Sequence, residues 1–309
     1  MLDGSVIKEP AGDLMQRSII GHPLFHPRTL AAGRYHTVAI REDGSCVWCG
    51  DNSYGQTSLA DWNNIVSVAC GYNHTLGLSE EGKVVAAGSN QYGELDTSCW
   101  EHVVDIAGGM FHSVALHDNG TVSAVGNNEK GQCDTDTWNH IIQVEAGKDF
   151  TVGLRSNGTV TATGGEIRDL DVKDWTDIKA IAAGYHFLLG IRYNGSILAA
   201  GQGETIIDFE KSNENALFTA ENWRKIRIVS VGAVHSVGVC ENNSVVAAGM
   251  NLQQSDVKEL KNVVDAEAGM LHTAFLLRDG RVVALGDNSH GQCNVDTWEN
   301  IRMPEQLTL

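Results

Sequence analysis

Five histidines recur along the 309-residue chain in one local setting, and histidine is a common side chain for metal binding and proton transfer. Each lies three residues after a glycine, and they are His36, His74, His112, His235 and His272. Two further copies of this setting hold Phe150 and Phe187 at the same place. Phenylalanine cannot bind a metal ion, and equivalent positions of separate repeats lie far apart. We therefore interpret the histidines as packed, hydrogen-bonded side chains and expect no metal site.

The cysteines offer a second kind of chemistry. Cys46 and Cys49 form the only CxxC among seven scattered cysteines. A structural zinc site needs four ligands, and no second CxxC or close histidine pair follows this one. Residues three apart on a strand also point to opposite faces. We expect thiols that pack as small hydrophobic side chains, with no disulfide framework.

Composition and charge exclude several classes of function. No G-x-S-x-G, H-E-x-x-H, P-loop or Rossmann motif occurs, so we expect no enzyme and no cofactor. The 22 basic and 39 acidic residues give a net charge of −17. This charge repels nucleic acid and attracts basic proteins. No apolar run is long enough for a membrane span, and the start does not resemble a secretion signal. We expect a cytoplasmic protein, with secretion of a processed form left open.

The histidines belong to a longer repeat that is marked by glycine. The seven marker glycines are Gly33, Gly71, Gly109, Gly147, Gly184, Gly232 and Gly269. They are 37 or 38 residues apart, except for one interval of 48. Apolar strands lie before and after each marker, and an Asp-Gly or Asn-Gly turn such as residues 41–45 leads into a third strand. Each unit thus holds three clear strands and room for a short fourth.

The repeat predicts an all-β, single-domain protein spanning residues 1–309. Seven such units are typical of a seven-bladed β-propeller with four-stranded antiparallel blades. Trp298 and the following residues restart a unit that the C-terminal segment does not finish, and residues 2–10 resemble the turn and third strand of another. We expect segments 1–30 and 298–309 to pair and close the ring, which removes an exposed strand edge.

The combined motifs resemble repeats of the RCC1 (regulator of chromosome condensation) family. They are G-x-x-H-T/S-x-x-L, D/N-G-x-V, G-x-N-x-x-G-Q and W-x-x-I/V, in common register from Gly33 to Met303. The units that begin at Gly147, Gly184 and Gly232 depart from the third motif. The resemblance implies a seven-bladed propeller. The short repeats are also similar to those of a bacterial β-lactamase inhibitor protein, which implies binding through aromatic residues that follow the marker.

The two residues after each marker glycine form our first candidate binding site. They are Arg34 and Tyr35, Tyr72 and Asn73, Met110 and Phe111, Lys148 and Asp149, Tyr185 and His186, Ala233 and Val234, and Met270 and Leu271. In a closed propeller these loops emerge on one face near the axis. Aromatic residues and methionine are enriched at protein interfaces, so we expect all but Ala233 and Val234 to contact a partner. The alternative is that these side chains fold back and plug the axis.

The long segment 202–222 is a second candidate, with Phe209 and Phe218 as apolar anchors, although a neutral insertion is equally compatible with the sequence. We therefore expect a monomeric, non-enzymatic protein-interaction propeller whose partner is a protein, and the net charge of −17 favours a basic one. One alternative, implied by the RCC1 resemblance, is guanine-nucleotide exchange on a small GTPase. Another is a glycan or small-ligand binder at the propeller axis. No direct nucleic-acid or membrane contact is expected.

Overall fold

The computed structural model describes residues 19, 22, 27–165, 171–201, 220, 223–249 and 257–304. Within these ranges the regular elements are strands, grouped into seven antiparallel three-stranded sheets. Each sheet comprises three consecutive strands, with the second in the middle. Each sheet is therefore one blade built from one repeat.

The first four blades have the following strands: β1 (Leu30–Ala32), β2 (His36–Ile40) and β3 (Cys46–Gly50); β4 (Ile65–Cys70), β5 (His74–Ser79) and β6 (Val84–Gly88); β7 (Val103–Gly108), β8 (His112–His117) and β9 (Val122–Gly126); β10 (Ile141–Ala146), β11 (Phe150–Arg155) and β12 (Val160–Gly164). The last three blades have these: β13 (Ile178–Ala183), β14 (Phe187–Arg192) and β15 (Ile197–Gly201); β16 (Ile226–Val231), β17 (His235–Cys240) and β18 (Val245–Gly249); β19 (Val263–Ala268), β20 (His272–Leu277) and β21 (Val282–Gly286).

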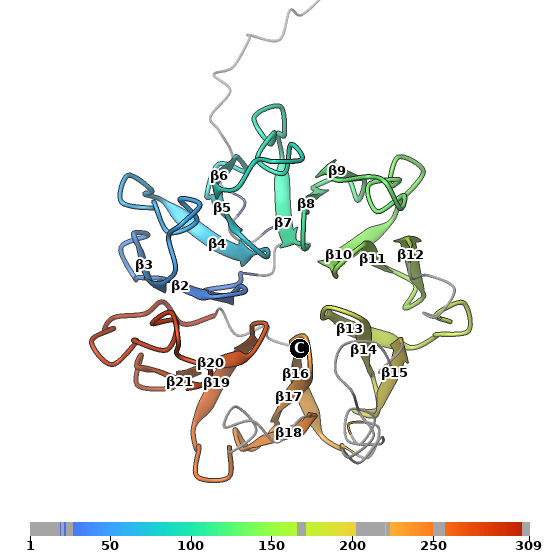
Figure 1. The fold of residues 1–309 in the computed structure, drawn as a ribbon. Coiled ribbons are helices and arrows are strands. Elements are labelled where there is room, and N and C mark those ends of the chain that lie inside the picture. Colours follow the sequence, from blue (N-terminus) through green and yellow to red (C-terminus); the bar gives the residue numbers. More distant parts are fainter. Residues whose placement is uncertain are drawn as a thin grey trace, which may run out of the picture.

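The blades form a closed ring with the first strand of each blade nearest the axis (Figure 1). These inner strands contact one another in order from β1 to β19, and β19 contacts β1 again. The middle strands are buried along almost their whole length, because a neighbouring blade covers each face. The predicted seven-bladed propeller is confirmed.

Among the described residues each blade has three strands, where four were predicted. Residues 51–64 run as successive turns instead of a strand. Side chains hold these turns, since Asp51 accepts a hydrogen bond from the Ser53 amide at 3.1 Å and Asn52 accepts one from the Thr57 amide at 2.9 Å. Local bonds of this kind compete with the ladder bonds that a strand would need. Residues 127–140 and 287–300 repeat the arrangement.

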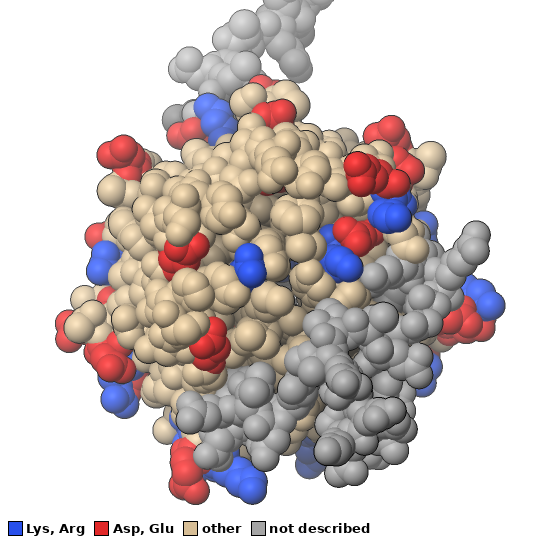
Figure 2. All heavy atoms as spheres, viewed as in Figure 1, with Lys and Arg blue, Asp and Glu red and all other residues tan. Residues whose placement is uncertain are grey.

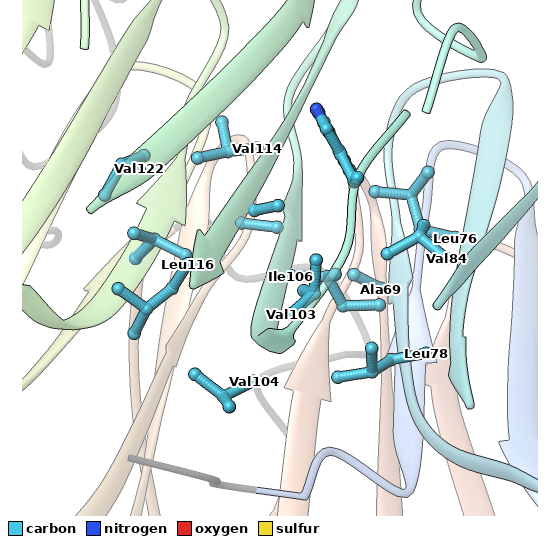
Figure 3. Close-up of a cluster of buried hydrophobic side chains, with 14 of the residues drawn as sticks. Ala69, Leu76, Leu78, Val84, Val103, Val104, Ile106, Val114, Leu116 and Val122 are labelled. Atoms are coloured by element: carbon cyan, nitrogen blue, oxygen red, sulfur yellow. The ribbon is translucent and has the colours of Figure 1, made fainter. Parts of the chain in front are cut away.

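Hydrophobic side chains join each blade to the next. Figure 3 shows one such cluster, in which Leu76 and Leu78 of the second blade lie near Val103 and Ile106 of the third. Trp100 and Trp138 are buried in the same cluster. Because every blade shares its core with two neighbours, each repeat is stabilised by the repeats beside it.

The C-terminal segment closes the ring on the first blade. Trp298 and Ile301 are buried in one cluster with Leu30 of the first blade and Leu276 of the seventh. Ile301 forms an antiparallel bridge with Arg41, next to the end of β2. Trp298 and Ile301 therefore contact both the first and the last blade, while the pairing of segment 298–309 with segment 1–30 stays a prediction. The expected N-terminal partner, residues 2–10, lies outside the described residues.

One described residue of the N-terminal segment lies elsewhere on the ring. The Ile19 amide donates a hydrogen bond to the Glu80 carbonyl at 2.9 Å, and its side chain joins the core between the second and third blades. Among the described residues, no helix is long and apolar enough to cross a membrane.

Candidate interaction face at the axis

The marker glycines lie where the backbones of adjacent blades meet. A Cβ atom on Gly33 would lie 2.7 Å from the carbonyl oxygen of Gly71, and the same conflict recurs around the ring until Gly269 meets Gly33. Hydrogen bonds follow this path, since the Tyr72 amide donates to Gly109 at 3.2 Å and the Met270 amide donates to Gly33 at 3.1 Å. This close approach requires glycine and fixes the two following residues at the mouth of the axis.

Each of the five repeated histidines connects its own blade to the next. His36 Nε2 lies 3.0 Å from Thr75 Oγ1, which in turn donates to the Gln56 carbonyl at 2.7 Å. A hydroxyl has a single hydrogen, so Thr75 accepts from the histidine Nε2–H. His272 and Thr37 repeat the bond at 2.8 Å where the ring closes. The packing interpretation of these histidines agrees with this geometry.

Burial keeps these histidines neutral. It lowers the pKa of His36, His112 and His272 to about 3 and the pKa of His74 and His235 to about 4. The cause is desolvation, which disfavours the charged imidazolium. The histidines are thus uncharged hydrogen-bond donors below the binding face at neutral pH.

Aromatic rings and a cation cover the mouth of the axis. The Arg34 guanidinium carbon lies 4.3 Å from the ring centroid of Tyr35 and 4.3 Å from that of Tyr72. The Tyr72 ring lies 5.8 Å from Phe111 and 6.4 Å from Tyr185. Since Tyr72 belongs to the second blade and Tyr185 to the fifth, side chains meet across the axis here.

Other predicted residues extend this cluster. The Tyr185 hydroxyl donates to Met110 Sδ at 3.2 Å, and the Lys148 ammonium lies 5.5 Å from the Tyr185 ring centroid. Lys148 also forms an ion pair with Asp149 at 3.8 Å, and His186 packs edge-on against Tyr185. Each of these side chains is partly buried.

A small cavity of about 100 Å³ lies at the axis. Residues before, at and after the marker glycines of all seven blades line it, including Arg34, Tyr72, Tyr185 and Met270. Leu271 is partly buried, whereas Asn73, Ala233 and Val234 are buried. Phe209 and Phe218 lie outside the described residues. The structure thus brings most of the predicted side chains together over the axis.

Sequence reasoning missed three residues on the outer loops of the same face. Tyr54 and Tyr92 have exposed fractions of 55% and 40%. Tyr92 of the second blade lies 5.0 Å from Phe111 of the third, and His290 of the seventh stacks at 4.0 Å on Tyr35 of the first. The sequence pattern that could have predicted these three residues is the large side chain directly before the second glycine of the G-x-N-x-x-G-Q turn. We call the combined set the aromatic face: Tyr35, Tyr54, Tyr72, Tyr92, Phe111, Tyr185 and His290.

A polar, largely buried cluster lies along the axis on the inner strands, with exposed side-chain fractions of 21% for Arg28, 14% for Glu145 and 0% for Asp105. Arg28, just before β1, donates to Glu145 at 2.8 Å and to the Val144 carbonyl at 3.0 Å, and it lies 3.5 Å from Asp105. Burial raises the pKa of Glu145 to about 7, although Arg28 opposes the rise. Burial also raises the pKa of Glu267 to about 8, with a further rise from Asp265. Arg28 therefore joins the first, third and fourth blades, in a cluster whose glutamates are partly protonated at neutral pH.

These features define the class of the protein as a closed seven-bladed β-propeller with an aromatic face around its axis. Four segments match the family model for the regulator of chromosome condensation (RCC1) repeat, at residues 28–56, 65–94, 103–132 and 263–292. These segments are the first, second, third and seventh blades. Four of the seven units thus match the RCC1 repeat that the motifs resemble. No curated protein sequence matches the chain.

Solved structures show the same fold. The ectodomain of the Physcomitrella patens receptor kinase CR4 has a TM-score of 0.66 and 17% identity, over 84% of this chain and 73% of that one. The CRINKLY WD40 ectodomain of the Arabidopsis thaliana receptor kinase ACR4 has a TM-score of 0.66 and 16% identity, over 90% and 99%. Prp20p from Saccharomyces cerevisiae, described with binding properties to Gsp1p and histones, has a TM-score of 0.59 and 18% identity, over 86% and 83%. Identities this low establish the fold alone.

Proposed function

We propose that this propeller is a non-enzymatic protein-interaction scaffold that binds its partner through the aromatic face. The observation that carries the proposal is the convergence of aromatic side chains from the first, second, third, fifth and seventh blades on one face. Interface hot spots are enriched in tyrosine and arginine and lie in such clusters. Tyr54 and Tyr92 remain substantially exposed, so a partner would bury apolar surface there.

Charge supports a basic partner. The chain has a net charge of −17, and Figure 2 shows one face of the ring, where acidic side chains gather mainly toward the rim and uncharged residues cover most of the remaining area. An acidic periphery would attract a basic protein during diffusion, whereas contacts nearer the axis would supply most of the binding energy. Prp20p offers a parallel, because histones are among its partners.

The test compares three immobilised full-length proteins in quantitative affinity capture. We expect the Tyr54→Ala, Tyr92→Ala double variant to retain at least roughly tenfold less partner than the wild type, because it removes two exposed aromatic contacts. Tyr193→Ala is the matched control, since Tyr193 is 69% exposed at the opposite end of its blade, in the turn between β14 and β15. If the double variant captures the same proteins in the same amounts as the control, the proposal is wrong.

The two alternatives have less support. The axial cavity of about 100 Å³ is smaller than the roughly 300 Å³ at which small-ligand pockets begin, so a sugar would have to displace Tyr72 and Tyr185. Nucleotide exchange depends on segment 202–222, of which only Ala220 is among the described residues.

A further inference from the structure

The seam where the ring closes brings two cysteines from opposite ends of the chain together. Cys49 Sγ, on β3 of the first blade, donates to the carbonyl oxygen of Gln292 at 3.3 Å. The next residue is Cys293, in the turn that follows the seventh blade. Thr37 donates to the same carbonyl at 2.7 Å, so two side chains of the first blade hold this turn in place.

Both cysteines are free thiols, and both are partly exposed. Cys293 Sγ donates to the Asp287 carbonyl at 3.3 Å, a weak bond that a side-chain rotation would break. Burial raises the pKa of Cys49 to about 12, and Cys293 adds to that rise because the two groups are close enough to repel when charged. Burial raises the pKa of Cys293 itself to about 11. Proximity and access therefore permit a reaction, while the raised pKa values make it slow.

Other seams show that this pairing is specific to the closure. In the seam between the third and fourth blades, Cys133 takes the place of Cys293 and Thr163 takes that of Cys49. Thr163 Oγ1 donates to the Gly131 carbonyl at 2.9 Å, and Cys133 Sγ donates to the Asn127 carbonyl at 3.4 Å. Thr163 therefore bonds the carbonyl one residue earlier in the turn than Cys49 does, and among the described blades only the closing seam has cysteine at both positions.

We propose that Cys49 and Cys293 form a reversible disulfide that covalently closes the propeller. With a low-molecular-weight disulfide such as oxidised glutathione, the Cys293 thiolate attacks one glutathione sulfur and releases one glutathione thiolate. The Cys49 thiolate then attacks Cys293 Sγ and releases the second glutathione. Two protein thiols lose two electrons and two protons, and one glutathione disulfide becomes two glutathione thiols.

The bond would reinforce the contact on which the whole ring depends. Without it, hydrogen bonds and the cluster around Trp298 and Leu30 hold the seventh blade to the first. A disulfide between residues so far apart in sequence restricts the unfolded chain strongly. It would also block separation of the first and last blades. Local opening is expected there, because no chain connection joins these two blades.

The experiment uses the full-length chain with Cys99→Ser, because Cys99 is exposed and would compete for the oxidant. The reduced protein is incubated with oxidised glutathione, alkylated, digested and analysed by mass spectrometry. We expect a linked peptide joining Cys49 to Cys293, and an unfolding temperature roughly 5 °C above that of the reduced protein. A reductant should reverse both. Formation should accelerate about tenfold per pH unit between pH 7 and 9, because both thiols titrate above this range.

Matched variants distinguish the proposal from general oxidation. Cys293→Ser and, independently, Cys49→Ser should abolish both the linked peptide and the temperature shift, whereas Cys133→Ser should retain both. The reduced variants should unfold near the temperature of the reduced parent, which shows that they fold. The proposal is overturned if oxidation yields only glutathione adducts or another cysteine pair, or if the temperature shift persists without Cys293.

Discussion

At the scale of single residues, this propeller depends on pairs of side chains whose partners lie in the next blade. His112 is buried, its Nε2 lies 3.0 Å from Thr151 of the fourth blade, and its ring lies over Gly109. Phe150 occupies the same place in the fourth blade and is also fully buried. Filling the space over the marker glycine is therefore shared by six of the seven blades, with Val231 nearest to Gly184 in the fifth, and the hydrogen bond is an addition to it.

The first prediction separates these two contributions at His112. Replacement by Phe should reduce the free energy of unfolding by about 1–2 kcal/mol, because it fills the space but loses one hydrogen bond. Replacement by Ala should cost more, about 3 kcal/mol or above, because it also leaves a cavity. Urea denaturation of the two variants measures the difference. An Ala variant as stable as the Phe variant would show that packing over Gly109 contributes little.

At the scale of strands and turns, the sequence predicts what repeats and misses what crosses between blades. The three strands of each blade follow from apolar runs between glycine-containing turns. The predicted fourth strand does not form at residues 51–64, because the side chains of Asp51 and Asn52 accept hydrogen bonds from the backbone of their own turn. The axial residues were predictable because every marker loop is equivalent. The stacking of His290 on Tyr35 was not, since residues 255 positions apart become neighbours only through closure of the ring.

The second prediction concerns the closing segment. Trp298 is 4% exposed and lies between the seventh and first blades, so Trp298→Ala should reduce the free energy of unfolding by about 3–5 kcal/mol. Glu299→Ala is the control, because Glu299 is exposed in the same turn and should change stability by less than about 0.5 kcal/mol. Chemical denaturation measures both. Equal stability of the two variants would mean that the C-terminal segment does not support the ring.

At the scale of the whole molecule, two sets of buried groups oppose each other as pH changes. The five histidines have folded pKa values of about 3 or 4 against an ordinary value of 6.5, so the unfolded chain binds their protons first and stability falls as pH drops below 6.5. Three buried acids on the inner strands have the opposite effect on stability, because their pKa values are raised in the folded state. Burial raises the pKa of Asp265 to about 6, of Glu145 to about 7 and of Glu267 to about 8.

These acids keep their protons in the folded state after the unfolded chain has lost them near pH 4, so their contribution declines as pH rises toward 8. Between pH 4.5 and 6.5 the five histidines outnumber the three acids, and stability should rise with pH. Between pH 6.5 and 8 the unfolded histidines lose their remaining protons, so the folded acids dominate and stability should fall. The third prediction is therefore a maximum near pH 6.5 in the urea midpoint measured from pH 5 to 9. Glu267→Gln should flatten the alkaline side, because its amide remains neutral, and should steepen the acidic side, because one of the three acids that oppose the histidines there is lost. A wild-type midpoint that stays constant from pH 6.5 to 9 would contradict the assignment of these buried acids.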